Sequence, residues 1–255
     1  MKLASIPNFR DIGGYHTRDG RIVRYGRLYR SGYLGKLSPG DRDRLDAAGI
    51  RSVIDLRSQR DIAREGGVIL PAGARSIHLN VAGDSANSSN LRYVLMSSDR
   101  SAQNALLGAG KAEGLMTSSL VQLALGRTAV FRSLLVQLSD KNALPAIIHC
   151  SAGKDRTGWA VTLILLALGV EEKDVLDHYL LSNEYRRAEV AWSLQQLSQY
   201  IDGELVRPLL EVRPQYLLAA LRAIRKRFGS FDDYFTKMLK FDSDHRRHLQ
   251  ANLLN

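Results

Sequence analysis

The stretch that most constrains the fold covers residues 143–170 and reads ALPAIIHC, then SAGKDRTG, then WAVTLILLALGV. The first part is short and apolar, which is typical of a strand buried on both faces, as in parallel sheets. The last part contains no proline and is shorter than the roughly 20 apolar residues of a membrane span, so it predicts a buried helix. A strand, a polar loop and a helix in this order predict an α/β fold.

The sheet is expected to lie in the N-terminal part of the chain. RSVIDLRS (51–58) and ARSIHLNV (74–81) are short β-rich runs that predict two further strands. RIVRYGRLYRSG (21–32) alternates in the manner of a strand, with glycines at its bends, and predicts an early hairpin. The segments after Gly158 have helical patterns, so the C-terminal helices should pack on this sheet.

A short helix is predicted within residues 37–50, LSPGDRDRLDAAGI. Ser38 is a suitable N-cap, and Pro39 suits the first helical position because a helix does not need its missing N–H there. Gly49 can adopt the left-handed conformation that commonly ends a helix.

We expect one domain over residues 1–255, with a small, mostly parallel sheet flanked by helices and a helical half over 159–255. Residues 84–119 are rich in Ser, Ala, Gly and Asn and have weak helical periodicity. This composition predicts a mobile, lid-like helical insertion. A long amphipathic helix is predicted over residues 119–138, leading back to the strand before the polar loop.

The charge of the chain indicates the chemistry of its partners. A net charge of +10 favours anionic partners such as phosphorylated molecules, nucleic acid or acidic lipid headgroups, and it also fits a basic solvated surface without such a partner. The expected partners are phosphorylated proteins or phosphoinositides. Nucleic acid is not expected, because the arginines are scattered and do not alternate with aromatic residues in one tract. LRAIRKRFG (221–229) is basic and amphipathic and would allow peripheral membrane contact, although such a stripe is more often a solvated helix face.

The number and spacing of the cysteines and histidines indicate the cellular compartment and whether a metal is bound. Cys150 is the only cysteine in 255 residues, so no internal disulfide can form. A reducing, cytoplasmic location is expected, with export left open. The N-terminus contains no apolar stretch of signal-peptide length. No metal site is predicted, because the histidines have no cysteine or acidic cluster at ligand spacing.

Cys150 stands between the predicted strand and the predicted helix. A loop that enters a helix can direct several backbone N–H groups at one point, and these groups form an anion site together with the helix dipole. The same field favours a thiolate and makes it nucleophilic. Gly153 would allow a tight turn, Arg156 can bind two oxygens of a phosphoryl group, and Thr157 can donate its hydroxyl group to the sulfur. The loop therefore predicts phosphoryl transfer to Cys150.

Two other interpretations of the loop explain less. A small buried residue is the usual role of a lone cysteine, but it leaves Arg156 and the strand–loop–helix setting unexplained. A nucleotide-binding P-loop needs a glycine five residues before the GK pair and a Ser or Thr after the lysine, where this chain has Ile148 and Asp155. The phosphoryl-transfer interpretation is therefore retained.

HCSAGKDRTG (149–158) resembles the signature loop of cysteine-dependent protein tyrosine phosphatases. NFRDIGGY (8–15), LYRSG (28–32), VIDLRS (53–58) and YLLSNEY (179–185) make the chain similar to the bacterial atypical branch of that family over nearly its whole length. The resemblance implies the fold of that family, no cofactor, Cys150 as the nucleophile and Arg156 as the phosphate clamp. It further implies that the substrate phosphate is bound by Ser151, Ala152, Gly153, Lys154, Asp155 and Arg156.

Two aspartates compete for the role of the general acid that protonates the leaving group. Asp84 lies at the start of the predicted lid, at a place where related enzymes have an aspartate. Asp155 lies inside the loop, where a carboxylate requires a reason such as protonation or an ion pair with Lys154 or Arg10. We place Asp155 slightly ahead of Asp84.

Five residues are expected to support the cysteine loop (residues 150–156): His149, Thr157, Arg10, Asp11 and Arg57. His149 should orient Cys150 through a hydrogen bond. Asn8, Arg10 and Asp11 would fit a surface turn, but the resemblance implies a segment that packs beside the loop and supports its geometry. Arg57 follows a strand, where α/β sites gather, so a supporting role is favoured over a catalytic one.

These features predict a phosphatase that forms a phosphocysteine intermediate and hydrolyses phosphotyrosine. Phosphoserine, phosphothreonine and phosphoinositides are further candidate substrates, and Lys154 adds a cation that suits substrates with more than one phosphate. The alternative is a phosphate-binding module with an idle loop, although binding alone would not need the thiol of Cys150.

Overall fold

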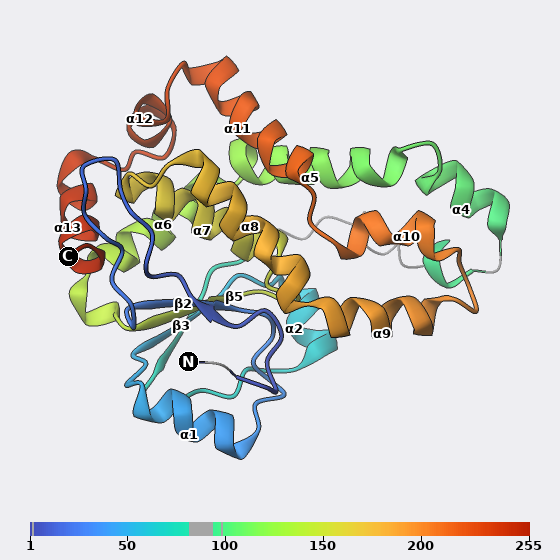
Figure 1. Cartoon of the computed structure of the whole chain (residues 1–255), viewed down its shortest axis with the longest axis horizontal. Helices are drawn as coiled ribbons and strands as arrows, with labels where there is room; N and C mark the ends of the chain where they lie inside the picture. Colours follow the sequence, from blue (N-terminus) through green and yellow to red (C-terminus); the bar gives the residue numbers. More distant parts are fainter. Residues whose placement is uncertain (2, 82–93, 98) are drawn as a thin grey trace.

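The structure is a computed structural model that describes residues 1, 3–81, 94–97 and 99–255. Its centre is a five-stranded sheet in the order β1-β2-β5-β3-β4 (Figure 1). All neighbouring strands are parallel except β1 and β2, which are antiparallel. The strands are β1 (Arg10–Asp11), β2 (Leu28–Ser31), β3 (Ser52–Asp55), β4 (Arg75–His78) and β5 (Ala146–His149). The predicted α/β class with a small, mostly parallel sheet is confirmed.

Helices flank the sheet, and the helices and turns after the cysteine loop account for nearly all of the C-terminal part. They are α1 (Pro39–Ala47), α2 (Gln59–Glu65), α4 (Arg100–Leu107), α5 (Lys111–Gly126), α6 (Thr128–Ser139), α7 (Asp155–Leu168), α8 (Glu172–Tyr185), α9 (Arg187–Leu197), α10 (Gly203–Leu210), α11 (Pro214–Phe228), α12 (Phe231–Asp233) and α13 (Ser243–Leu253). No single helix in the described ranges is long and apolar enough to cross a membrane; α5 and α6 meet that test only as a pair, with a bend of 66° between them.

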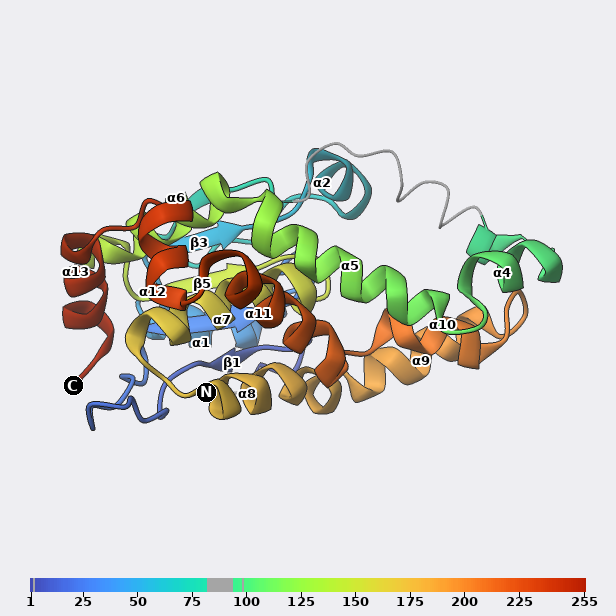
Figure 2. The same cartoon turned by 90° about the horizontal axis from the view of Figure 1, so that it is seen from above.

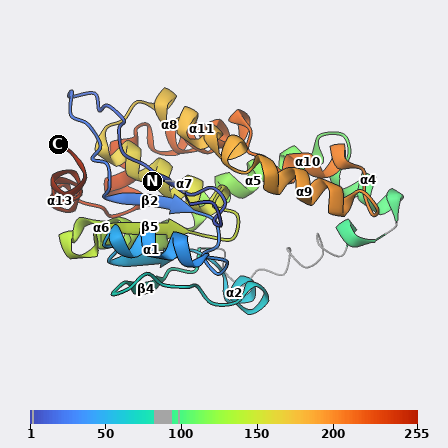
Figure 3. The same ribbon diagram turned by 60° about the horizontal axis from the view of Figure 1, so that its bottom comes forward.

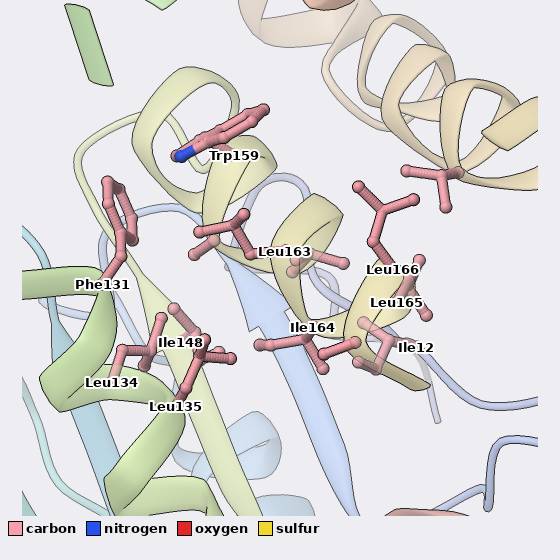
Figure 4. Packing of buried hydrophobic residues seen from close by; sticks show 14 of the residues in the cluster. Ile12, Phe131, Leu134, Leu135, Ile148, Trp159, Leu163, Ile164, Leu165 and Leu166 are labelled. Atoms are coloured by element: carbon pink, nitrogen blue, oxygen red, sulfur yellow. The ribbon is translucent and has the colours of Figure 1, made fainter. Parts of the chain in front are cut away.

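Successive residues of β5 contribute to different clusters on the two faces of the sheet, as the alternation of a strand requires. Ile147 packs with Val53 in a smaller cluster on the side of α1. Ile148 packs with Ile54 in the larger cluster, which includes Trp159 and much of α6 and α7 (Figure 4). Figure 1 shows the sheet between α1 on one side and α7 and α8 on the other, and in Figure 3 α1 overlaps the strands. The central strand is therefore buried on both faces.

Two local predictions near the N-terminus have different outcomes. The short helix is confirmed: α1 begins after Ser38, whose side chain accepts a hydrogen bond from the N–H of Asp41. The hairpin within residues 21–32 is wrong in its pairing, because β2 pairs with β1. Ile22 makes only an isolated bridge, with His16. Glycines marked the bends, but sequence alternation could not identify the partner strand.

The single long helix predicted over residues 119–138 is also wrong. It is divided into α5 and α6, whose axes differ by 66°. Arg127 between them has φ −117° and ψ 28°, outside the helical range. Gly126 precedes it, and glycine is a poor helix former. Leu123 and Phe131 nevertheless lie in the same core, so the apolar pattern continues through the bend.

A helical extension projects from one end of the molecule and consists of α4, the N-terminal part of α5, α9 and α10 (Figures 1 and 2). Leu107 and Ala112 pack there with Ile201 and Val206. The described part of the predicted lid-like insertion thus consists of helices packed on α10. Residues 84–93 and 98 of that prediction lie outside the described residues, and a lid function stays a prediction.

Candidate active site

The cysteine loop lies at the carboxyl edge of the sheet, between β5 and the N-terminus of α7. β5 pairs with β2 on one side and β3 on the other, so the position of Cys150 is fixed by the sheet. Cys150 is buried. Within the described chain, no hydrogen bond is formed by the backbone N–H groups of residues 151–156. These groups are therefore available to an anion, as at other helix N-termini.

Two glycines allow the loop and its helix to approach their neighbours closely. Gly153 has φ +65°, and a Cβ atom there would lie 2.4 Å from the carbonyl oxygen of Ser31. A Cβ atom on Gly158 would lie 3.0 Å from the ring of Tyr179 on α8. Larger residues would displace the loop from β2 and α7 from α8.

Side chains from β1 and β2 and from the segment before them bind the carbonyl groups of the loop. Asn8 donates from Nδ2 to the carbonyl oxygens of Gly153, at 2.8 Å, and Ala152, at 3.3 Å. Arg30 on β2 donates from Nη2 to the same oxygen of Gly153. Arg10 in turn donates to the side-chain oxygen of Asn8. These donors hold the loop through its carbonyl groups.

The side chain of Asp11 bonds to backbone groups outside the cysteine loop. Its carboxylate accepts hydrogen bonds from the N–H of Gly13, at 2.8 Å, and the N–H of Gly26, at 2.7 Å. It therefore links the backbone at Gly13 to the backbone at Gly26. In the segment NFRDIGGY, Asn8 and Arg10 contact or support the loop, whereas the side-chain hydrogen bonds of Asp11 are made to Gly13 and Gly26, so a supporting role of Asp11 stays a prediction.

Arg156 is held by a carboxylate that sequence reasoning did not identify. Its Nη1 atom lies 2.7 Å from Oδ2 of Asp61 on α2, and its Nη2 atom lies 3.4 Å from Oγ of Ser151. Burial disfavours the charged form of Arg156, but Cys150 and Asp61 outweigh this and raise its pKa. Burial also acts on Asp61, yet the guanidinium lowers the pKa of Asp61 to about 2. Both groups are thus charged at neutral pH.

His149, Asp55 and Arg57 form a buried layer next to Cys150. The Nδ1 atom of His149 lies 3.2 Å from the carbonyl oxygen of Cys150, and its Nε2 atom lies 3.7 Å from Oδ1 of Asp55. Burial is the main cause that lowers the pKa of His149 to about 4, so its ring is neutral at pH 7. Arg57 pairs with Asp55 through Nη2 and Oδ2 at 2.7 Å and lies 4.6 Å from the ring centre of Tyr33. This layer fixes the end of β3 beside the loop.

Lys154 and Asp155 form an ion pair inside the loop. The Nζ atom of Lys154 lies 2.8 and 2.6 Å from the two carboxylate oxygens of Asp155. Lys154 is only 5% exposed. An ion pair with Lys154 was one of the predicted reasons for the carboxylate of Asp155 inside the loop, and the structure contains this ion pair. The hydroxyl group of Thr157 is buried and has no hydrogen-bond partner in the described chain, Cys150 included. Asp84 lies outside the described residues.

A pocket of about 800 Å³ opens beside Ser151 and Ala152. Its walls come from the N-terminal segment, from Tyr33 and from the α8–α9 region, where Tyr185 and Trp192 line it. Trp192 is 62% exposed, which is unusual for so large an apolar ring. The pocket thus borders the cysteine loop at Ser151 and Ala152.

Sequence reasoning missed the roles of Asp61 and Arg30, and it expected Asn8 beside the loop without identifying its contacts. Asp61 had a detectable signal, because Ser58 and Asp61 form a capping box at the start of α2. That motif predicts a helix start, however, and says nothing about contact with Arg156. Arg30 lies within LYRSG and Asn8 begins NFRDIGGY, so the motifs were recognised while the individual contacts were not.

Comparison with known proteins agrees with this geometry. The model of a family described as the tyrosine phosphatase family matches residues 1–255. The chain is 34% identical to a candidate tyrosine-protein phosphatase of Cupriavidus necator, covering 95% of this chain and 85% of that protein. It is 31% identical to the triple specificity protein phosphatase PtpB of Mycobacterium tuberculosis, covering 92% of this chain and 93% of that protein. The chain, with its cysteine loop between β5 and α7, belongs to the tyrosine phosphatase family.

Proposed function

We propose that the protein hydrolyses phosphotyrosine in proteins through a phosphocysteine intermediate. One observation carries the proposal: Cys150 lies in a loop with free backbone N–H groups and a guanidinium fixed by Asp61. In the first step, the sulfur of Cys150 bonds to phosphorus while the bond from phosphorus to the tyrosine oxygen breaks, and the leaving oxygen takes a proton. In the second step, water attacks phosphorus, loses a proton, and releases inorganic phosphate and the thiolate.

The loop stabilises the charge that develops in both steps. The free N–H groups of residues 151–156 and the guanidinium of Arg156 can donate to the nonbridging oxygens of the phosphoryl group. Asp61 prevents Arg156 from adopting other orientations, because the ion pair measures 2.7 Å and both side chains are largely buried. The proposal is tested by phosphate release from p-nitrophenyl phosphate, and a wild-type protein that releases none over a broad pH range would exclude it.

The pocket favours an aromatic leaving group. Tyr33, Tyr185 and Trp192 line it, and aromatic side chains pack well against the ring of a phosphotyrosine. The relative PtpB is named a triple specificity phosphatase, which supports proposing phosphoserine and phosphothreonine as additional substrates. These shorter side chains would reach less of the pocket, so we expect lower catalytic efficiency with them.

We propose Asp155 as the general acid, ahead of Asp84. Asp155→Ala should lose the basic limb of the pH–rate profile with phenyl phosphate, whose leaving group needs a proton, and should slow that reaction about 10²-fold. The reaction with p-nitrophenyl phosphate should change much less, because its leaving group is stable as an anion. Asp84→Ala serves as the matched variant and should keep the basic limb. If Asp84→Ala loses the limb and Asp155→Ala keeps it, the assignment is reversed.

Phosphoinositides are proposed as a second substrate class because of Lys154. A substrate with two phosphates could place its second phosphate near Nζ of Lys154. The ammonium group would then leave Asp155 and bind this second phosphate. Lys154→Ala should therefore reduce kcat/KM for a soluble phosphoinositide about tenfold more than for a phosphotyrosine peptide. Lys36→Ala, which alters another lysine of the pocket wall, is the control. Equal losses on both substrates in Lys154→Ala would refute a role for Lys154 in choosing phosphoinositides.

A further inference from the structure

Two arginines lie buried behind the cysteine loop and have no acidic partner among the residues that the structure describes. Arg30 is 0% exposed and Arg10 is 5% exposed. In the described part of the chain, no carboxylate lies within ion-pair distance of either guanidinium, whereas the other buried arginines, Arg57 and Arg186, each pair with one. A buried charge is costly unless it is paired, so the absence of a carboxylate here requires an explanation.

The hydrogen bonds of the two arginines do not replace a counter-charge. Arg30 donates from Nη2 to the carbonyl oxygen of Gly153 and lies 3.4 Å from Oγ of Ser182. Arg10 donates to the carbonyl oxygen of His178 at 3.0 Å and shares Ser182 at 3.3 Å. The Nε and Nη1 atoms of Arg30 and the Nε atom of Arg10 are buried and have no hydrogen-bond partner in the described chain.

Arg10 has the ring of Tyr185 at 4.9 Å from its guanidinium carbon and the carboxylate of Glu184 beyond ion-pair distance, but the groups around Arg30 add little negative charge. Burial lowers the pKa of His178 well below its usual value, with Arg30 and Arg10 adding to the effect, so the ring is neutral. Burial raises the pKa of Tyr179 well above its usual value, so its hydroxyl group is also neutral. Burial and the neighbouring Arg10 both disfavour the charge of Arg30, and Cys150 is the strongest of the groups that favour it. The natural counter-charge is therefore an anion in the cysteine loop.

We propose that Arg30, with Arg10 beside it, is a positioning residue whose uncompensated charge favours the thiolate of Cys150 and a phosphoryl group bound in the loop. Arg30 acts through space and through the carbonyl group of Gly153, to which it donates a hydrogen bond. In the free enzyme its charge is unfavourable, and anion binding relieves this. The inference rests on the proposed function of the loop as a phosphoryl-transfer site.

Other charged groups must be considered in any pH test of Cys150. These groups face the sulfur or the two arginines from the neighbouring elements. They are Arg156 and Asp155 on α7, Lys154 in the loop, His149 on β5, Asp55 on β3, Asp61 on α2, Tyr15 after β1, and His178, Tyr179, Glu184 and Tyr185 on α8. Arg30 forms no ion pair with any of these side chains in the described chain. Replacing it should therefore leave the ion pairs among them intact.

The test is the pH dependence of Cys150 alkylation by iodoacetamide, which needs no turnover. In Arg30→Met the midpoint of this dependence should move up by about one pH unit, and the dissociation constant of inorganic phosphate should rise about tenfold. Arg30→Lys restores the charge and should return the midpoint most of the way to the wild-type value. Arg186→Met, which removes a buried arginine that does have a carboxylate partner, should leave the midpoint unchanged.

Stability separates this role from a structural one. The phosphate-free Arg30→Met protein should melt at or above the wild-type temperature, because an unpaired buried charge is removed, whereas Arg186→Met should melt lower. An unchanged midpoint and phosphate affinity in Arg30→Met would overturn the proposal, as would equal midpoint shifts in Arg30→Met and Arg186→Met. If Arg30→Met does not fold, the same measurement is made on Arg10→Met. We expect a smaller upward shift of the alkylation midpoint there, and an unchanged midpoint would overturn the proposal. A wild-type protein with this alkylation behaviour but no phosphatase activity would refute the proposed function alone.

Discussion

Replacing Cys150 by serine is expected to slow the release of phosphate from p-nitrophenyl phosphate by at least about 10⁴-fold. The variant keeps the free N–H groups and Arg156, so it keeps the anion site. A serine hydroxyl is not ionised at neutral pH, and among the residues that the structure describes no base forms a hydrogen bond with the side chain at position 150. The neighbouring ring of His149 contacts the carbonyl group of Cys150 instead. The measurement is the steady-state rate of phosphate release at several pH values.

Phosphate binding provides the control for this variant. Cys150→Ser should bind inorganic phosphate or a phosphotyrosine peptide with an affinity close to that of the wild type, because the loop donors are unchanged. An inactive variant that still binds would separate the enzyme from an idle binding module. A serine variant with activity near that of the wild type would instead show that the sulfur is not the nucleophile.

Replacing Arg156 by lysine is expected to lower kcat by about 10²–10³-fold, although the positive charge is retained. A lysine cannot form two parallel hydrogen bonds to a phosphoryl group, and it cannot at the same time hold Asp61 as the guanidinium does. The loss should fall mainly on kcat, because the interaction strengthens as the transition state forms. The rates are measured with p-nitrophenyl phosphate at saturation.

Asp61→Asn tests the same ion pair from the other side. It leaves every group that touches the phosphate in place but removes the carboxylate that orients Arg156, and kcat should fall about tenfold. Asp177→Asn, which removes an exposed ion pair with Lys173, is the matched control and should be neutral. If Asp61→Asn has wild-type kcat while Arg156→Lys is impaired, Arg156 does not depend on Asp61 for its orientation.

The central unit of the fold was predictable from the sequence because its signals are local. The apolar run that ends at His149, the loop and the apolar run after Gly158 give β5, the cysteine loop and α7 directly. The cap at Ser38 gives α1 for the same reason. The long helix over 119–138 failed because an apolar pattern records which residues are buried and not the direction of the helix axis.

The individual contacts that hold the loop could not be predicted, because the residues that make them come from distant parts of the chain. Asn8, Arg30 and Asp61 reach the loop from before β1, from β2 and from α2. Their contacts depend on the order of strands in the sheet, which local patterns do not determine. Asp11 shows the converse, since it lies in the same motif as Arg10 but bonds to the backbone at Gly13 and Gly26.

The most direct measurement for the central claim is to trap the intermediate. Wild-type protein mixed with p-nitrophenyl phosphate is quenched in acid during turnover, digested, and analysed by mass spectrometry. We predict one phosphoryl group on the peptide that contains Cys150, and none on the same peptide from Cys150→Ser. Turnover without any phosphorylated Cys150, or with the phosphoryl group on another residue, would contradict the phosphocysteine mechanism.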